Sequence, residues 1–238
     1  MIYVMSDLHG EYSLYRAMLD QIHLGEDDLL YVLGDVVDRG PQPMEILLDM
    51  MKRPNVILLA GNHEMMALSC LQFLMQEISE ESLSGMDSVR MGRLLSWQQI
   101  GGQTTLDGFH RLNAENRSAV LTYLEEAELF EEVETEDAVY ILVHAGLGHF
   151  APDKPLWDYS AEDLLWTRPD YDTPYFTDDR FVITGHTPTQ LIPENPRPGF
   201  LFQRNGHINI DCGCFAPGGR LCCLRLDDGK VFYTEHKA

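Results

Sequence analysis

The sequence predicts an α/β protein, because apolar strand-like runs and helix-like segments alternate along its first third. The apolar runs span residues 2–5, 29–33 and 56–60, and the helical segments between them span 14–22 and 44–51. A strand, helix, strand, helix, strand order predicts a parallel sheet with right-handed crossovers.

Local signals set the ends of the two helical segments. In the first, Leu14, Met18 and Ile22 recur at helical spacing, and Gly25 ends the pattern. In the second, Pro43 stands where a helix would start and Pro54 follows as a stop.

The middle of the chain carries Leu, Met and Glu at helical spacing. We expect residues 64 to about 132 to form a mostly helical insertion, a cap beside the sheet, broken at Gly85 and at Gly101-Gly102. Strand patterns return at 139–143 and 181–183. The chain shows no linker or internal repeat, so residues 1–238 are expected to form a single domain.

The last part of the chain predicts further strands. Residues 208–210, 221–226 and 231–233 are interpreted as a closing antiparallel meander, with a hairpin turn at Asp228-Gly229. The segments 168–180 and 193–206, rich in Pro, Asp, Arg and aromatic residues, are interpreted as surface loops.

The negative net charge of the chain restricts the molecules that it can bind. The chain has 17 Lys and Arg against 38 Asp and Glu, a net charge of −21. Such a chain has no basic footprint for nucleic acid, and an anionic membrane surface would repel it. For an anionic ligand, bound divalent cations would reverse the field locally.

Apolar runs and cysteines point to a cytoplasmic protein. No run reaches the roughly 18 apolar residues of a membrane helix, and the N-terminus reads as a strand rather than a signal peptide. The five cysteines lack the spacing of a disulfide framework or a zinc site, so we expect buried or half-exposed thiols in a reducing compartment.

Polar side chains follow each predicted parallel strand, where the strand ends. The carboxyl ends of parallel strands lie along one edge of a sheet, which is where ligands bind. These side chains should therefore converge there. The polar segments are Asp7-Leu8-His9, Asp35-Val36-Val37-Asp38-Arg39, Asn62-His63-Glu64, His144 and His186. Asp, His and Asn together suit manganese, iron or zinc.

In these motifs the chain resembles the calcineurin-like metallophosphoesterase superfamily, and within it the small bacterial and phage-type serine/threonine phosphoprotein phosphatases. The motifs occur in family order across nearly the whole chain. They are Asp7-Leu8-His9-Gly10, Gly34-Asp35-Val36-Val37-Asp38-Arg39-Gly40, Gly61-Asn62-His63-Glu64, Val143-His144-Ala145-Gly146 and Gly185-His186-Thr187. The resemblance implies a four-layer sandwich of two central β-sheets flanked by helices, with a helical cap.

The resemblance also implies the role of each site residue. Two divalent metal ions, manganese before iron or zinc, would be bound by Asp7, His9, Asp35, Asn62, His144 and His186. Asp35 would bridge the two ions, and a hydroxide bound to both would attack phosphorus directly, without a phosphoenzyme.

Four further residues are expected to act on the substrate. By the resemblance, His63 would be the general acid, oriented by Asp38, and Arg39 would bind phosphate oxygens. Arg168, in Trp166-Thr167-Arg168, is assigned as a second phosphate-binding residue, with a surface pairing to Asp170 or Asp172 as the alternative.

The resemblance leaves the substrate open. The first interpretation is a hydrolase of phosphate monoesters on phosphoserine or phosphothreonine proteins, and small phosphoesters are further candidates. The alternative is a symmetrical dinucleoside polyphosphate hydrolase acting on diadenosine tetraphosphate. A non-catalytic, metal-stabilised binding module is the least favoured reading. The sequence predicts no oligomeric state.

Overall fold

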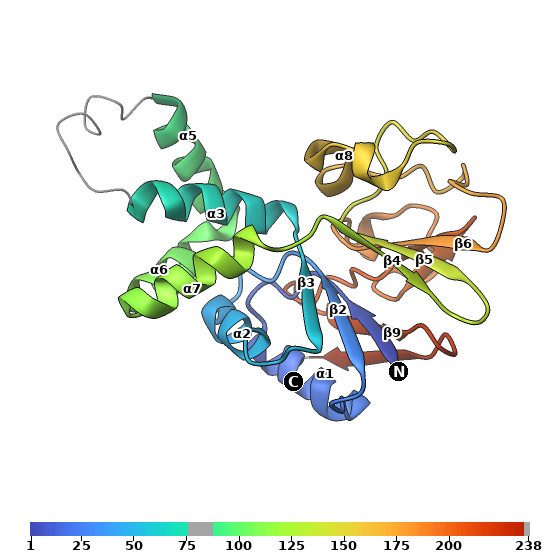
Figure 1. The fold of residues 1–238 in the computed structure, drawn as a ribbon, viewed down its shortest axis with the longest axis horizontal. Helices are drawn as coiled ribbons and strands as arrows, with labels where there is room; N and C mark the ends of the chain where they lie inside the picture. Colours follow the sequence, from blue (N-terminus) through green and yellow to red (C-terminus); the bar gives the residue numbers. More distant parts are fainter. Residues whose placement is uncertain (76–87, 236–238) are drawn as a thin grey trace.

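In the computed structural model, which describes residues 1–75 and 88–235, the chain forms an α/β fold with two mixed five-stranded sheets (Figure 1). The first sheet has the order β10-β9-β1-β2-β3. Its strands are β1 (Ile2–Met5), β2 (Leu29–Leu33), β3 (Val56–Leu59), β9 (Arg220–Arg225) and β10 (Val231–Glu235). The first three are parallel, and β9 and β10 extend the sheet as an antiparallel hairpin.

The second sheet has the order β4-β5-β6-β8-β7. Its strands are β4 (Phe130–Glu134), β5 (Val139–Val143), β6 (Arg180–Thr184), β7 (Phe202–Arg204) and β8 (His207–Asn209). Strands β5, β6 and β8 are parallel, and the outer strands β4 and β7 are antiparallel to their neighbours.

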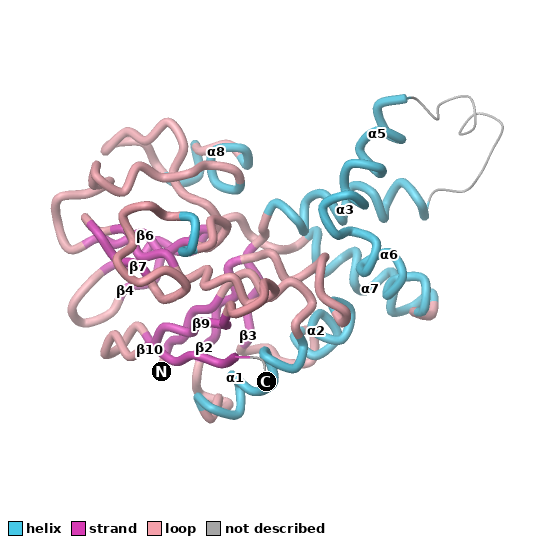
Figure 2. Tube along the Cα trace, turned by 180° about the vertical axis from the view of Figure 1, so that it is seen from behind, coloured by secondary structure: helices cyan, strands magenta, loops and turns pink. Residues whose placement is uncertain are grey.

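Helices flank both sheets (Figures 1 and 2). The helices beside the first sheet are α1 (Tyr12–Ile22) and α2 (Pro43–Met50). At one end of the molecule lie α3 (Asn62–Met75), α5 (Ser88–Trp97), a π-helical turn (Gln98–Gly102), α6 (Gln103–Arg111) and α7 (Ala114–Glu125). Beside the second sheet lie the short α8 (Ala161–Leu165) and 3-10 turns at Leu156–Asp158 and Thr189–Leu191.

Alternate residues of the inner strands enter different hydrophobic cores, as the two-residue period of a strand requires. On β2, Leu30 and Val32 pack with α1 and α2, whereas Leu33 packs in the core between the two sheets. On β5, Leu142 enters that same central core, while Val143 packs under α8. Both faces of each sheet are therefore covered, and the carboxyl ends of the parallel strands remain for the site.

Three details of the sequence prediction are corrected by the structure. The helical region ends at Glu125, and β4 follows within the segment assigned to helix. The sequence missed this strand because Phe130 and Val133 are three residues apart among glutamates and give no two-residue alternation. The segment 193–206 contains β7 as well as loop. The three C-terminal runs do not form one meander, since β8 joins the second sheet and β9-β10 the first. Gly85 lies outside the described residues.

All five cysteines are buried and free, as expected. Within the described part of the chain, no helix is long and apolar enough to cross a membrane.

Candidate metal centre

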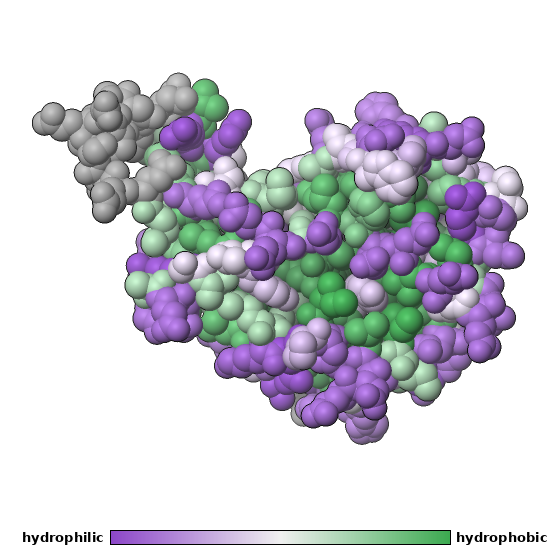
Figure 3. Space-filling model, viewed as in Figure 1, coloured by the Kyte–Doolittle hydropathy of each residue, from purple (hydrophilic) through white to green (hydrophobic). Residues whose placement is uncertain are grey.

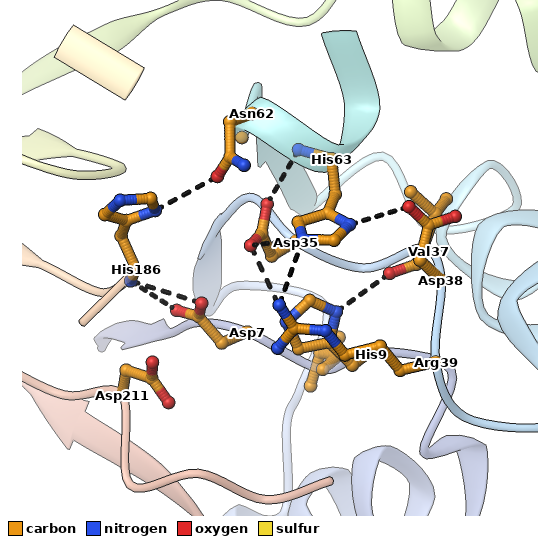
Figure 4. A network of polar contacts seen from close by, with 12 residues as sticks. Asp7, His9, Asp35, Val37, Asp38, Arg39, Asn62, His63, His186 and Asp211 are labelled. Carbon is orange, nitrogen blue, oxygen red and sulfur yellow. Dashed lines mark hydrogen bonds and ion pairs between the residues drawn. The ribbon is translucent and has the colours of Figure 1, made fainter. Parts of the chain in front are cut away.

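The predicted ligand side chains come from both sheets and meet where their parallel strands end (Figure 4). Asp7 follows β1 and His186 follows β6, and the backbone N–H of His186 donates to the Asp7 carboxylate at 3.0 and 3.2 Å. His144, after β5, donates its Nδ1–H to the carbonyl of Leu33 on β2 at 2.7 Å. These bonds join the edges of the two sheets around one site.

Much of the backbone at this edge lies in the left-handed region, which non-glycine residues seldom adopt. The residues concerned, with φ in degrees, are Asp7 (53), His9 (40), Asp35 (50), Asp38 (70), Arg39 (67) and His186 (63). Such conformations persist only where surrounding contacts impose them, and they cluster at functional sites.

Two glycines are required because carboxylates approach their backbone closely. A Cβ at Gly61 would overlap the carboxylate of Asp35, and a Cβ at Gly185 would overlap that of Asp7. Each glycine directly precedes a predicted ligand, Asn62 or His186. The spacing of these motifs therefore reflects packing as well as chemistry.

Two groups of side chains could each hold a metal ion, and they share Asp35. In the first, Asp35 Oδ2 lies 3.6 Å from His9 Nε2 and 3.9 Å from His63 Nε2. In the second, Asp35 Oδ1 lies 3.5 Å from His144 Nε2, which lies 3.2 Å from His186 Nδ1. The carboxylate thus has one oxygen in each group, as a bridging ligand would.

The donor chemistry of these groups fits cations. His9 and His144 each donate Nδ1–H to a backbone carbonyl, at 3.0 and 2.7 Å, so each presents the Nε2 lone pair toward Asp35. Such hydrogen bonds fix the ring tautomer in metal sites. Lone pairs and carboxylate oxygens that converge in a buried space repel one another unless a cation lies among them.

The environment moves the pKa values of these groups. Burial lowers the pKa of His9 and of His186 to about 3, which keeps both rings neutral and able to ligate. Burial alone would raise the pKa of Asp35, but the neighbouring His144, His63 and His9 lower it below its ordinary value. The site therefore holds an ionised Asp35 carboxylate near the neutral rings of His9 and His186.

Asp7 and Asn62 complete the set of predicted ligands. Asn62 Oδ1 lies 2.9 Å from His144 Nε2 and 3.0 Å from His186 Nδ1, within the second group. Asp7 lies outside both three-residue groups, beside Asp211 (Figure 4). Burial, Asp211 and Asp35 raise the pKa of Asp7, and burial raises that of Asp211 to about 7.

Glu64 supports the loop that carries Asp35. Its buried carboxylate accepts backbone N–H bonds from Asp35, Val36, Val37 and Gly61 at 2.6–3.2 Å. Glu64 thus bonds the backbone of two motifs at once.

His63 and Asp38 form a buried pair beside the first group. His63 Nδ1 lies 2.6 Å from Asp38 Oδ2, and Arg39 Nη2 lies 3.2 Å from His63 Nε2. Burial lowers the pKa of His63, but Asp38 and Asp35 outweigh it, and the pKa lies above its ordinary value. The Arg39 guanidinium lies 4.3 Å from the centre of the Phe215 ring. The sequence analysis did not single out Phe215.

Arg168 lies at the opposite side of the site. It donates to Thr187 Oγ1 at 2.9 Å, next to His186, instead of pairing with the nearby acidic residues that the alternative proposed. Asp172 pairs with Arg204. The exposed Trp166 lies edge-on to the ring of His186 at 6.4 Å between centroids.

An apolar cleft of about 600 Å³ adjoins the site. Its walls run from α3 and α5 to Trp166, whose ring lies edge-on to that of His186. The apolar lining residues include Met65, Met66, Val89, Trp97, Ile100 and Trp166. On the face seen in Figure 3, apolar surface gathers in the middle, between the helical end and the part that carries α8.

Two His/Asp groups that share one carboxylate, at the carboxyl edge of two mixed sheets, are consistent with a dimetal site. The class of protein that this fold and site define is a metal-dependent hydrolase.

Comparison with known proteins narrows the class. The model of the calcineurin-like phosphoesterase family matches residues 1–190. The chain is 28% identical over 215 residues to serine/threonine-protein phosphatase 2 of Salmonella typhimurium, and this alignment covers 88% of this chain and 80% of that protein. It is 29% identical over 166 residues to the symmetrical bis(5'-nucleosyl)-tetraphosphatase of Nitrosospira multiformis, covering 69% of this chain and 48% of that protein.

A solved structure agrees with this assignment of the fold. A serine/threonine phosphatase from Saccharomyces cerevisiae superposes with a TM-score of 0.61 at 16% identity, covering 100% of this chain and 80% of that one. The chain therefore belongs to the calcineurin-like phosphoesterase family and is a metal-dependent phosphoesterase. Its relatives divide between protein phosphatases and dinucleoside tetraphosphatases.

Proposed function

We propose that the chain is a phosphatase that hydrolyses phosphate monoesters on phosphoserine and phosphothreonine proteins. The observation that carries the proposal is the Asp38–His63–Arg39 arrangement directly beside the two groups that share Asp35. Together these residues provide a proton donor (His63), a phosphate-binding cation (Arg39) and a shared carboxylate (Asp35), which are the parts that phosphomonoester hydrolysis needs.

In this proposal six side chains hold the metals. Asp35, which belongs to both groups, would be shared by the two ions. Asp7 and His9 are proposed as the further ligands of one ion, and Asn62, His144 and His186 as those of the other. Two divalent cations bound there would supply the positive charge that activates water and stabilises the phosphoryl oxygens. Manganese is the first ion to test and iron and zinc are the next, because this donor set suits all three.

Three residues act on the phosphoester itself. His63 donates a proton from Nε2 to the leaving oxygen, and Asp38 at Nδ1 holds the ring in the orientation that this requires. Arg39 binds phosphate oxygens with its planar guanidinium, which Phe215 supports from one side. Its distance of 3.2 Å from His63 Nε2 puts the phosphate-binding group next to the acid.

Arg168 is proposed as the second phosphate-binding residue. It is exposed, and its bond to Thr187 directs it to the His186 side of the site. Arg39 and Arg168 would then bind the phosphoryl group from opposite sides, which fixes its orientation for in-line displacement.

Two observations favour a phosphoprotein. One sequence alignment that covers most of both chains is with a protein phosphatase. The apolar cleft lined by Met65, Trp97 and Trp166 suits the side chains that flank a phosphorylated residue in a peptide. We further propose one domain over residues 1–238, in which the helices from α3 to α7 form an insertion and α3 and α5 supply one wall of this cleft.

A second candidate function is symmetrical hydrolysis of diadenosine tetraphosphate. Symmetrical tetraphosphatases are among the relatives, with 35% identity over 81 residues in Wigglesworthia glossinidia brevipalpis. In that case the cleft and the 168–180 and 193–206 loops would receive a base.

The test is a comparison of kcat/KM on manganese-loaded protein. Phosphoserine and phosphothreonine peptides are compared with diadenosine tetraphosphate at matched ionic strength, and the His63→Asn variant controls for contaminating phosphatase. The proposal expects faster peptide turnover. Faster nucleotide turnover would replace it with the second candidate, and turnover of neither would refute both.

A further inference from the structure

The Asp38 carboxylate is held by more than its histidine. It is fully buried, and both oxygens accept side-chain hydrogen bonds. Oδ2 accepts from His63 Nδ1 at 2.6 Å and from Trp97 Nε1 at 2.8 Å. Oδ1 accepts from Thr105 Oγ1 at 2.6 Å, and the same hydroxyl accepts the Asp38 backbone N–H at 2.8 Å.

These bonds determine the orientation of the carboxylate. The terminal torsion of an aspartate is soft, so the plane of the group is set by its partners. Thr105 closes a ring with the side chain and backbone of Asp38, while Trp97 fixes the oxygen that faces His63. Both partners are neutral donors, so they solvate the charge of Asp38 without replacing it as the partner of the imidazole.

Both donors come from the helical end of the molecule. Trp97 is the last residue of α5 and Thr105 lies in the first turn of α6, and both are buried. The π-helical turn between these helices fits closely around the site. Gly101, with φ of 116°, accepts the Arg39 N–H at 3.0 Å, and a Cβ there would lie 2.6 Å from Arg39 Cγ.

The next glycine shows the same close fit. A Cβ at Gly102 would lie 2.5 Å from the indole ring of Trp97. The segment from Trp97 to Thr105 is therefore shaped by its contacts with Asp38 and Arg39. Neither donor belongs to the two groups that could hold metal.

We propose that Trp97 and Thr105 are positioning residues that orient Asp38, and through it the proton-donating ring of His63. This inference rests on the proposed role of His63. It assigns the helical end a specific effect on proton transfer to the leaving oxygen and none on metal binding.

The test uses two nearly isosteric variants of the full chain, Trp97→Phe and Thr105→Val, which remove one donor each. Thr105→Ser restores the hydroxyl and serves as the rescue. Matched controls are Trp157→Phe, at a 78% exposed tryptophan, and Thr122→Val, at an exposed position on α7.

The kinetic readout is the dependence on the leaving group. A general acid accelerates a reaction about 10²–10⁴-fold, and a misoriented acid loses part of that acceleration. We expect kcat for phenyl phosphate to fall about 10–100-fold, and that for 4-nitrophenyl phosphate, whose leaving group needs little protonation, to fall less than about threefold. KM and metal content should stay unchanged, and Thr105→Ser should recover most of the loss.

A second readout does not depend on activity. The Nδ1–H proton of His63, assigned in NMR spectra by its loss in His63→Asn, should exchange slowly in the wild type and faster in both variants. This signal tests the positioning role even if the wild type hydrolyses no phosphoester, which would refute the proposed function alone. Equal losses for both leaving groups, or an unchanged Nδ1–H signal, would overturn the inference.

Discussion

Replacing Glu64 by Gln tests how firmly the Asp35 loop is held. Glu64 Oε2 accepts the N–H groups of Asp35 at 2.6 Å and Gly61 at 2.9 Å. Oε1 accepts those of Val36 at 2.8 Å and Val37 at 3.2 Å. Each carboxylate oxygen thus serves two buried donors.

A glutamine has one carbonyl oxygen and one donor group in the same space. In either orientation of the amide, two buried backbone N–H groups face an NH₂ and lose their acceptor. A hydrogen bond to a charged group contributes about 1.5–3 kcal/mol, so the loss of two, after partial relaxation, is expected to cost about 3–5 kcal/mol. That is a large part of a stability that is usually about 5–15 kcal/mol.

The assay is urea unfolding of metal-free protein at about pH 8, because burial and the charge of Asp35 raise the pKa of Glu64. Glu134→Gln, an exposed change on β4, is the matched control and should alter the free energy of unfolding by less than about 0.5 kcal/mol. A loss below about 1 kcal/mol for Glu64→Gln would refute the argument from its four hydrogen bonds.

Three further outcomes are expected. His63→Asn keeps both metals, measured by elemental analysis, but slows turnover of phenyl phosphate about 10²-fold or more, and unchanged turnover would exclude an acid role. Gly185→Ala introduces a Cβ that overlaps Asp7 and should weaken manganese binding at least about tenfold by titration calorimetry; wild-type affinity would contradict the close approach. Asp49→Asn should lower stability at pH 7 by about 1–2 kcal/mol, because Asp49 accepts bonds from Arg53 at 2.7 Å and from two other side chains. Burial alone raises the pKa of Asp49, but Arg53 lowers it below 3.8. The stability that the Asp49 carboxylate contributes is therefore complete above pH 3.8 and is lost as the pH falls through the lowered pKa. If acid destabilised the wild type and Asp49→Asn equally, this explanation would be contradicted.

The first sheet could be predicted because its signals are local. The apolar runs of β1, β2 and β3 are buried on both faces, and Pro43 and Gly25 mark the ends of the helical segments between them. The rule that parallel strands share a carboxyl edge then predicted the meeting of Asp7, Asp35 and Asn62, as observed.

The second sheet was harder to predict because its partners are distant in sequence. β4 carries glutamates on its exposed positions, and β7 and β8 have three residues each. Whether β8 pairs with β6 or with β9 depends on long-range packing that no local pattern encodes.

The same limit applies within the site. Trp97, Thr105 and Phe215 contact Asp38 or Arg39, yet each looks like an ordinary core residue in the sequence. The doublet Gly101-Gly102 was visible, but it indicated only a helix break, and its close approach to Arg39 and Trp97 emerged from the structure.

The central claim is that Asp35 bridges two metal ions that hydrolysis requires. The most direct test measures manganese bound per chain, by elemental analysis after gel filtration, together with phosphate release for the wild type and Asp35→Asn. The account predicts two ions per wild-type chain, and joint loss of both ions and of activity in the variant. Two ions retained in the variant, or a wild type that is fully active with one, would contradict it.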